Sequence, residues 1–156
     1  MKMYIRNLTE EDARQICTWR YGGDYAVYNY PAWEIIVEQN WGLAQDMIRE
    51  KEYFAVMNEK GELMGHFRLK EQEKFIFMGV GLMPELCGHG YGAAVLEIII
   101  KESKERYPDK RLALEVRSYN HRAIKCYQKA GFRWADVYEL NIPSGRDFFV
   151  LMEHEG

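Results

Sequence analysis

The sequence contains few cysteines and histidines, and their spacing is typical of neither a disulfide-rich nor a metal-binding protein. The cysteines form an odd set without paired spacing: Cys17, Cys87 and Cys126. The histidines are scattered rather than spaced as ligand pairs: His66, His89, His121 and His154. We therefore expect reduced thiols and no metal site.

Long apolar runs and an excess of basic charge are also missing. No stretch approaches the roughly 20 apolar residues of a membrane-spanning helix, and Met1–Asp12 lacks the apolar core of a signal peptide. The formal net charge is −3, so the positive field that binds a nucleic-acid backbone is absent. These absences predict a cytoplasmic protein that binds neither membranes nor nucleic acids.

What the chain does contain is typical of one compact domain. Its 156 residues are close to the usual size of a single domain, and 47% of them are hydrophobic, a share too large for a disordered chain. No linker, internal repeat or low-complexity segment interrupts the sequence. We therefore expect a single domain over residues 1–156.

The first half of the chain predicts a strand, two helices and a three-stranded meander. Residues 3–6 alternate as a strand, and Thr9 followed by acids is typical of a helix start. Pro31 comes just before a second helix, expected from Ala32 to about Arg49. Strands are expected at 52–57, 63–69 and 75–83. Two glycines in the third of these, Gly79 and Gly81, indicate a bulge or a close backbone approach.

The second half alternates helices with strands. Apolar spacing over 88–105 predicts a helix that packs on a sheet, 112–116 alternates as a strand, and 120–130 predicts a short helix. Two final strands are expected at 132–140 and 147–152. The order β-α-α-β-β-β-α-β-α-β-β assigns the chain to the α/β (α+β) class.

A glycine-rich segment joins the third meander strand to the long helix, Leu82-Met83-Pro84-Glu85-Leu86-Cys87-Gly88-His89-Gly90-Tyr91-Gly92-Ala93. Glycines let the backbone approach a ligand, and a helix start carries partial positive charge, so this loop suits a pyrophosphate. A P-loop would need Gly-Lys-Ser/Thr, which does not occur here. A Rossmann loop would follow the first strand of a βαβ unit, whereas this loop follows a meander. A turn that merely caps the helix stays open as an alternative.

Two blocks of the sequence resemble the GCN5-related N-acetyltransferase (GNAT) family. Cys87-Gly88-His89-Gly90-Tyr91-Gly92 is similar, in register, to the family's acetyl-CoA loop Arg/Gln-x-x-Gly-x-Gly/Ala. Leu114-Glu115-Val116-Arg117-Ser118-Tyr119-Asn120, followed by Tyr127 and Gly131-Phe132, resembles the ribosomal-protein N-terminal alanine acetyltransferases. The first position departs from the family pattern, because Cys87 replaces arginine or glutamine. Backbone amides would then have to hold the phosphates.

The resemblance implies the GNAT fold, a central mixed, mostly antiparallel sheet of six to seven strands flanked by about four helices. It also implies acetyl-CoA as the cosubstrate and transfer of its acetyl group to a primary amine by direct attack in a ternary complex. His89 and Tyr91 would contribute mainly their amides. The residues expected to bind acetyl-CoA are Leu82, Met83, Cys87, Gly88, His89, Gly90, Tyr91, Gly92, Ala93 and Asn120.

The chemistry of the reaction indicates which side chains to look for. A primary amine is mostly protonated at neutral pH, so its attack on a thioester needs a base. By resemblance, Glu115 takes the amine proton directly or through water, and strand alternation puts it on one face with Ala113 and Arg117. Glu115 could instead pair with a neighbouring cation or lie on a solvated face. Glu85 and a water chain are the other candidate bases.

The departing thiolate needs a proton, and Tyr127 is the candidate acid because a phenol remains protonated at neutral pH. Tyr127 could also simply pack against Phe132. Asn120 could cap its helix, bond the pantetheine arm, or do both. The family stabilises the oxyanion with a backbone amide of its fourth strand, and Gly81–Met83 is the matching stretch here.

The acceptor amine is not identified by any motif. Aromatic residues lie where the family builds its acceptor pocket, although core packing explains at least half of them: Trp19, Tyr21, Tyr25, Tyr28, Tyr30 and Trp33. A small-molecule or peptide amine is compatible with the sequence, and so is a homodimer. A non-catalytic acyl-CoA-binding sensor or an interaction module is the alternative function.

Overall fold

The computed structural model describes residues 2–142 and 145–156. In this part of the chain, strands and helices alternate in the expected α/β manner, and three short 3-10 helices (η) interrupt them. Along the chain the elements are β1 (Met3–Asn7), α1 (Glu10–Ile16), η1 (Gly23–Tyr28), α2 (Trp33–Glu38), η2 (Gly42–Ala44), α3 (Asp46–Glu52), β2 (Tyr53–Asn58), β3 (Leu63–Glu71), β4 (Phe75–Leu82), η3 (Pro84–Leu86), α4 (Tyr91–Arg106), β5 (Arg111–Arg117), α5 (His121–Lys129), β6 (Phe132–Ile142) and β7 (Gly145–His154).

Hydrogen bonds order the seven strands of the described residues as β1-β2-β3-β4-β5-β7-β6. The β4–β5 pair is parallel, and the β1–β2, β2–β3, β5–β7 and β6–β7 pairs are antiparallel. The predicted fold class, a mixed and mostly antiparallel sheet with helices, is therefore confirmed. None of the helices described is both long and apolar enough to cross a membrane.

The chain divides into two compact units. The first runs to Arg68 and includes Val80–His89, and the second comprises Leu69–Gly79 and the chain from Gly90 onward. Strands β3 and β4 contribute residues to both units. The single domain over residues 1–156 stays a prediction.

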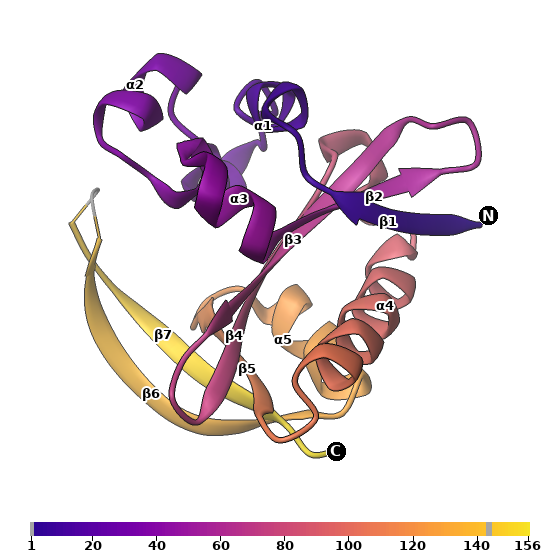
Figure 1. Ribbon diagram of the computed structural model, residues 1–156. Coiled ribbons are helices and arrows are strands. Elements are labelled where there is room, and N and C mark those ends of the chain that lie inside the picture. Colours follow the sequence, from indigo (N-terminus) through magenta and orange to yellow (C-terminus); the bar gives the residue numbers. More distant parts are fainter. Residues whose placement is uncertain (1, 143–144) are drawn as a thin grey trace. The chain divides into compact units, whose positions relative to one another are not determined.

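In the first unit, the helices pack on one face of β2. The expected helix start at Thr9 is a capping box in which the Thr9 side chain accepts from the Asp12 amide and the Asp12 carboxylate accepts from the Thr9 amide. Residues of α1, α2 and η2 are buried with alternate residues of β2. Figure 1 shows α1, α2 and α3 on the same side of β2. The shared core includes Ala13, Ile16, Ile36, Leu43, Tyr53, Ala55 and Met57.

The long second helix expected from Ala32 to about Arg49 is wrong. Helix α2 stops at Glu38, because Asn40 adopts the left-handed conformation with φ 58°. The Asn40 amide donates to the Val37 carbonyl and the Trp41 amide to the Ile36 carbonyl, which is the Schellman pattern of a helix end. The chain then forms η2 and a separate helix, α3, that leads directly into β2.

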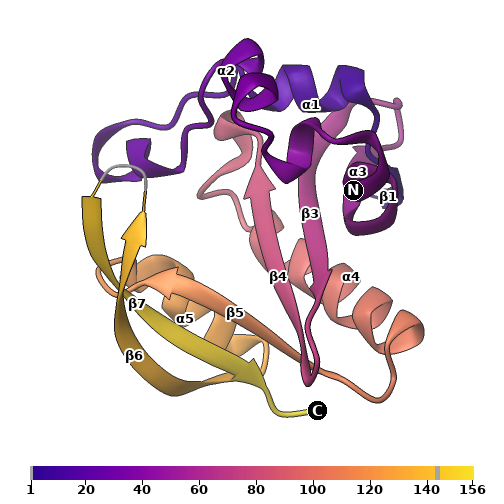
Figure 2. The ribbon, with the colours of Figure 1, turned by 60° about the vertical axis from the view of Figure 1, so that its left-hand side comes forward.

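In the second unit, β7 pairs with β5 on one side and β6 on the other. Figure 2 shows β6 and β7 as a long curved pair, longer than the sequence predicts. A one-residue bulge interrupts this pair, since Trp134 lies opposite Met152 while Asp136 lies opposite Leu151. Helix α5 contacts both β6 and α4.

Candidate functional site

The glycine-rich loop ends at an uncapped helix start. Gly88 and Gly90 have φ values of 81° and 83°, a left-handed conformation that side chains disfavour. Gly90 is the N-cap of α4, and no side chain caps this end of the helix. A Cβ added at Gly90 would have no atom within 4 Å. The first amides of a 16-residue helix are therefore free of a side-chain cap behind an open glycine, as an anion site requires.

Gly92 has a different role from the two glycines before it. It lies inside the first turn of α4, where an added Cβ would lie 3.7 Å from Sγ of Cys126 on α5. A Cβ there would make only an ordinary van der Waals contact, so the start of α4 lies beside α5, the helix that carries Tyr127. This contact lies within the second unit.

Cys87 occupies the position where the family has arginine or glutamine. Its half-buried Sγ lies 3.8 Å from the Met83 carbonyl and 4.0 Å from the Leu82 carbonyl. These are weak sulfur contacts with the end of β4. The thiol is thus directed back toward the end of β4. At this position the loop offers main-chain groups rather than a cationic side chain.

The end of β4 is held by contacts within the first unit. The Met83 amide donates to the Met64 carbonyl at 2.8 Å, so this amide of the predicted oxyanion stretch is already used. The Leu82 carbonyl accepts from the Tyr21 hydroxyl at 2.6 Å. Burial raises the pKa of Tyr21, so its hydroxyl stays protonated and donates. The side chain of Met83 borders a groove of about 660 Å³ that α1 also lines.

His66 is a residue near this strand end that the sequence analysis did not select. A Cβ at Gly81 would lie only 2.5 Å from Nε2 of His66, which is the close backbone approach expected from the glycines of this strand. The imidazole is buried, with Trp19 and Tyr30 at centroid distances of 5.9 and 6.2 Å. Burial lowers its pKa from 6.5 to about 4, so the ring is neutral at neutral pH.

The aromatic segment expected to form the acceptor pocket divides between core packing and surface positions. Trp19 is part of the first unit's core, and Tyr30 and Trp33 pack against it. Tyr21 bonds the end of β4, while Tyr25 and Tyr28 are half-buried in η1. Core packing therefore accounts for half of the segment, as expected.

Glu115, the predicted base, is an exposed residue of β5 in the second unit. Its carboxylate accepts a hydrogen bond from the Tyr138 hydroxyl of β6. Arg117, the neighbouring cation on the same face, pairs instead with Asp147 at 3.2 Å. The exposed position fits the alternative of a solvated face, and the role of Glu115 as the base stays a prediction.

Tyr127 lies on α5 and Asn120 precedes it as the N-cap. Both residues make the structural contacts that were the alternatives to a functional role. The Tyr127 ring meets Phe132 edge-on at 5.8 Å. The Asn120 side chain accepts from the Ala123 amide at 3.2 Å and so caps the helix. Neither contact excludes a second role, so acid and pantetheine ligand stay predictions for these residues.

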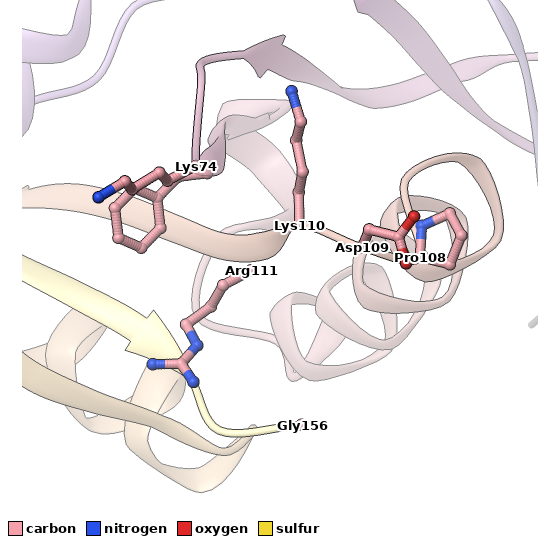
Figure 3. Close-up of a pocket in the computed structure, with 7 residues that line it drawn as sticks. Lys74, Pro108, Asp109, Lys110, Arg111 and Gly156 are labelled. Atoms are coloured by element: carbon pink, nitrogen blue, oxygen red, sulfur yellow. The ribbon is translucent and has the colours of Figure 1, made fainter.

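A second groove, of about 380 Å³, lies at the start of β5 and contains none of the predicted site residues (Figure 3). Lys110 on its edge is bonded to the Glu71 carboxylate and the Gln72 carbonyl. Its remaining lining residues are Lys74, Phe75, Pro108, Asp109, Arg111 and Gly156.

Comparison with known proteins agrees with the mixed α/β fold described above. The sequence profile described as the acetyltransferase (GNAT) family matches residues 10–132. The chain belongs to the GNAT acetyltransferase family. This GNAT chain is 28% identical over 117 residues to an N-alpha-acetyltransferase of Sulfurisphaera tokodaii, covering 65% of the chain and 70% of that protein.

Two solved structures share the GNAT fold. One is a chimera of the spermidine N-acetyltransferase SpeG from Vibrio cholerae and hSSAT (TM-score 0.79, 19% identity, 99% of this chain and 95% of that one). The other is the ribosomal-protein-S18-alanine N-acetyltransferase from Escherichia coli (TM-score 0.69, 22% identity, 98% and 93%). The family match covers the loop, Glu115, Asn120 and Tyr127, but ends before Tyr138.

Proposed function

We propose that this GNAT protein transfers the acetyl group of acetyl-CoA to a primary amine by direct attack in a ternary complex. The observation that carries the proposal is the start of α4, where Gly88 and Gly90 take left-handed φ values before an uncapped 16-residue helix. Backbone amides and the helix dipole together favour an anion such as the pyrophosphate of CoA. Cys87 supplies no cationic side chain, so main-chain amides would bind the pyrophosphate.

The bond changes follow from the chemistry of thioesters. The neutral amine nitrogen attacks the thioester carbon, Glu115 takes the amine proton directly or through water, and the C–S bond then breaks. Tyr127 gives its proton to the leaving thiolate, which departs as CoA thiol. The exposed Glu115 carboxylate is bonded to a hydroxyl rather than a cation, which suits a proton acceptor. Glu85, exposed beside the loop, and water stay the alternative bases.

Binding is tested by calorimetry with acetyl-CoA. Gly90→Ala strains the left-handed position by about 1–2 kcal/mol and should weaken binding at least about 5-fold. Gly23→Ala is the matched control, since Gly23 also has a positive φ (57°) with no atom within 4 Å of an added Cβ, but lies outside the loop. No affinity of the wild type for acetyl-CoA would overturn the proposal.

Catalysis is tested by measuring CoA release with a panel of acceptors that includes N-terminal alanine peptides, free lysine and spermidine. Tyr127→Phe should lower kcat by about 100-fold or more, and Glu115→Gln by a similar factor. Glu85→Gln should retain activity if Glu115 is the base. Wild-type activity in Tyr127→Phe would remove its assignment as the acid.

The same measurements separate the alternative functions. An acyl-CoA sensor would bind acetyl-CoA and release no CoA with any amine, and an interaction module with a degenerate loop would not bind it. Homodimer formation is a separate expectation that analytical ultracentrifugation tests.

A further inference from the structure

The described residues give Glu115 one hydrogen-bond partner, Tyr138. The phenol of Tyr138 donates to Oε2 of Glu115 at a distance of 2.5 Å. The two residues are not neighbours in sequence or in the sheet, because β7 lies between β5 and β6. Glu115 lies opposite Leu151, and Tyr138 opposite Phe149.

The bulge in β6 is what brings the two side chains to one face. Alternate residues of β7 share a face, so the residues opposite Leu151 and Phe149 also share it. If the register at Trp134–Met152 continued through Ala135 without a bulge, Tyr138 would lie opposite Phe148, on the other face. The bulge therefore moves Tyr138 to the face of Glu115, as bulges near active sites commonly redirect a side chain.

Arg117, a cation on the same face as Glu115, is paired with another carboxylate. Its guanidinium lies 3.2 Å from the Asp147 carboxylate and over the Phe149 ring at 5.2 Å. The hydroxyl stays protonated and donates to Glu115, because burial and the adjacent Glu115 raise the pKa of Tyr138. The bond to Oε2 restrains one oxygen of the exposed carboxylate, and the described residues make no hydrogen bond to Oε1.

We propose that Tyr138 is a positioning residue for the acyl-transfer base: it holds Glu115 through Oε2 so that Oε1 is presented to the amine proton. This inference rests on the proposed function. It extends the site to a residue beyond the family match, which ends at residue 132.

The test is a double-mutant cycle on kcat. Tyr138→Phe keeps the ring and removes only the hydroxyl, and we expect kcat to fall about 10-fold with the KM for acetyl-CoA unchanged. In the Glu115→Gln background the same change should have no further effect, because the carboxylate it orders is gone. A purely structural role would lower kcat by the same factor in both backgrounds, and would overturn the inference.

Tyr119→Phe is the matched control, since the Tyr119 hydroxyl also donates to a carboxylate, that of Asp147, at 3.3 Å. It should keep the wild-type kcat, and an equal loss there would contradict a specific role for Tyr138. Wild-type kcat in Tyr138→Phe would overturn the inference alone, as would full activity in Glu115→Gln. A wild type inactive with every amine would overturn the proposed function instead.

Discussion

Lowering the pH should destabilise this protein through His66, whose imidazole is buried against Gly81 beside Trp19 and Tyr30. Burial disfavours the charged ring and lowers its pKa to about 4 from the 6.5 of an exposed histidine. Because the folded-state pKa is the lower one, the neutral ring stabilises the fold fully above about pH 6.5. That stabilisation is lost as the pH falls toward about 4.

The size of the loss follows from the two pKa values of His66. Between about pH 7.5 and about pH 5, the unfolded chain takes up nearly a full proton at this site and the folded chain takes up very little. Linkage then gives a loss of about 2 kcal/mol in the free energy of unfolding.

Urea unfolding at the two pH values measures this loss. In His66→Gln the group is absent, so the difference between the two pH values should shrink by about 2 kcal/mol, whatever the stability of the variant at neutral pH. His121→Gln, at an exposed position on α5, is the control and should leave the difference unchanged. An equal pH dependence in wild type and His66→Gln would refute the reasoning.

Three substitutions test other contacts by urea or thermal unfolding. Gly81→Ala forces a Cβ to within 2.5 Å of the His66 ring and should lower the free energy of unfolding by about 1–3 kcal/mol. Gly22→Ala, whose added Cβ has no atom within 4 Å, should stay within about 0.5 kcal/mol of wild type. Equal effects of the two substitutions would contradict the close approach at Gly81. Asn120→Ala removes a helix cap and should lower the free energy of unfolding by about 1 kcal/mol. Asn120→Asp keeps the hydrogen-bond acceptor and should keep most of this stability. An equal loss in both variants would argue against capping. Tyr21→Phe removes the hydroxyl bond to the end of β4 and should cost about 1 kcal/mol, and an unchanged midpoint would mean the bond contributes nothing.

Local signals in the sequence predicted those parts of the fold that local chemistry determines. Thr9 with Asp12 three residues later forms the expected cap. Glycine in β4 correctly indicated a close approach, although only the structure identifies His66 as the partner of Gly81. The long second helix failed because an apolar pattern continues past Asn40, while the left-handed conformation of that one residue ends α2.

The candidate site, like the fold, could be predicted from the sequence only in part. The face of Glu115 could be predicted from strand alternation, and its partner could not. Tyr138 reaches it only across an intervening strand and after a bulge that reverses the alternation of β6. Bulges depend on pairing between strands, which no local pattern encodes.

The position of Cys126 beside the first turn of α4 has a practical consequence for assays of acetyl transfer. Reagents that detect released CoA by capturing thiols also react with cysteines of the protein, and Cys126 is only half-buried. A group added to its sulfur would lie beside the first turn of α4, because the sulfur is 3.7 Å from the Cβ position of Gly92. Following the acetylated product by mass spectrometry leaves this cysteine unmodified during the assay.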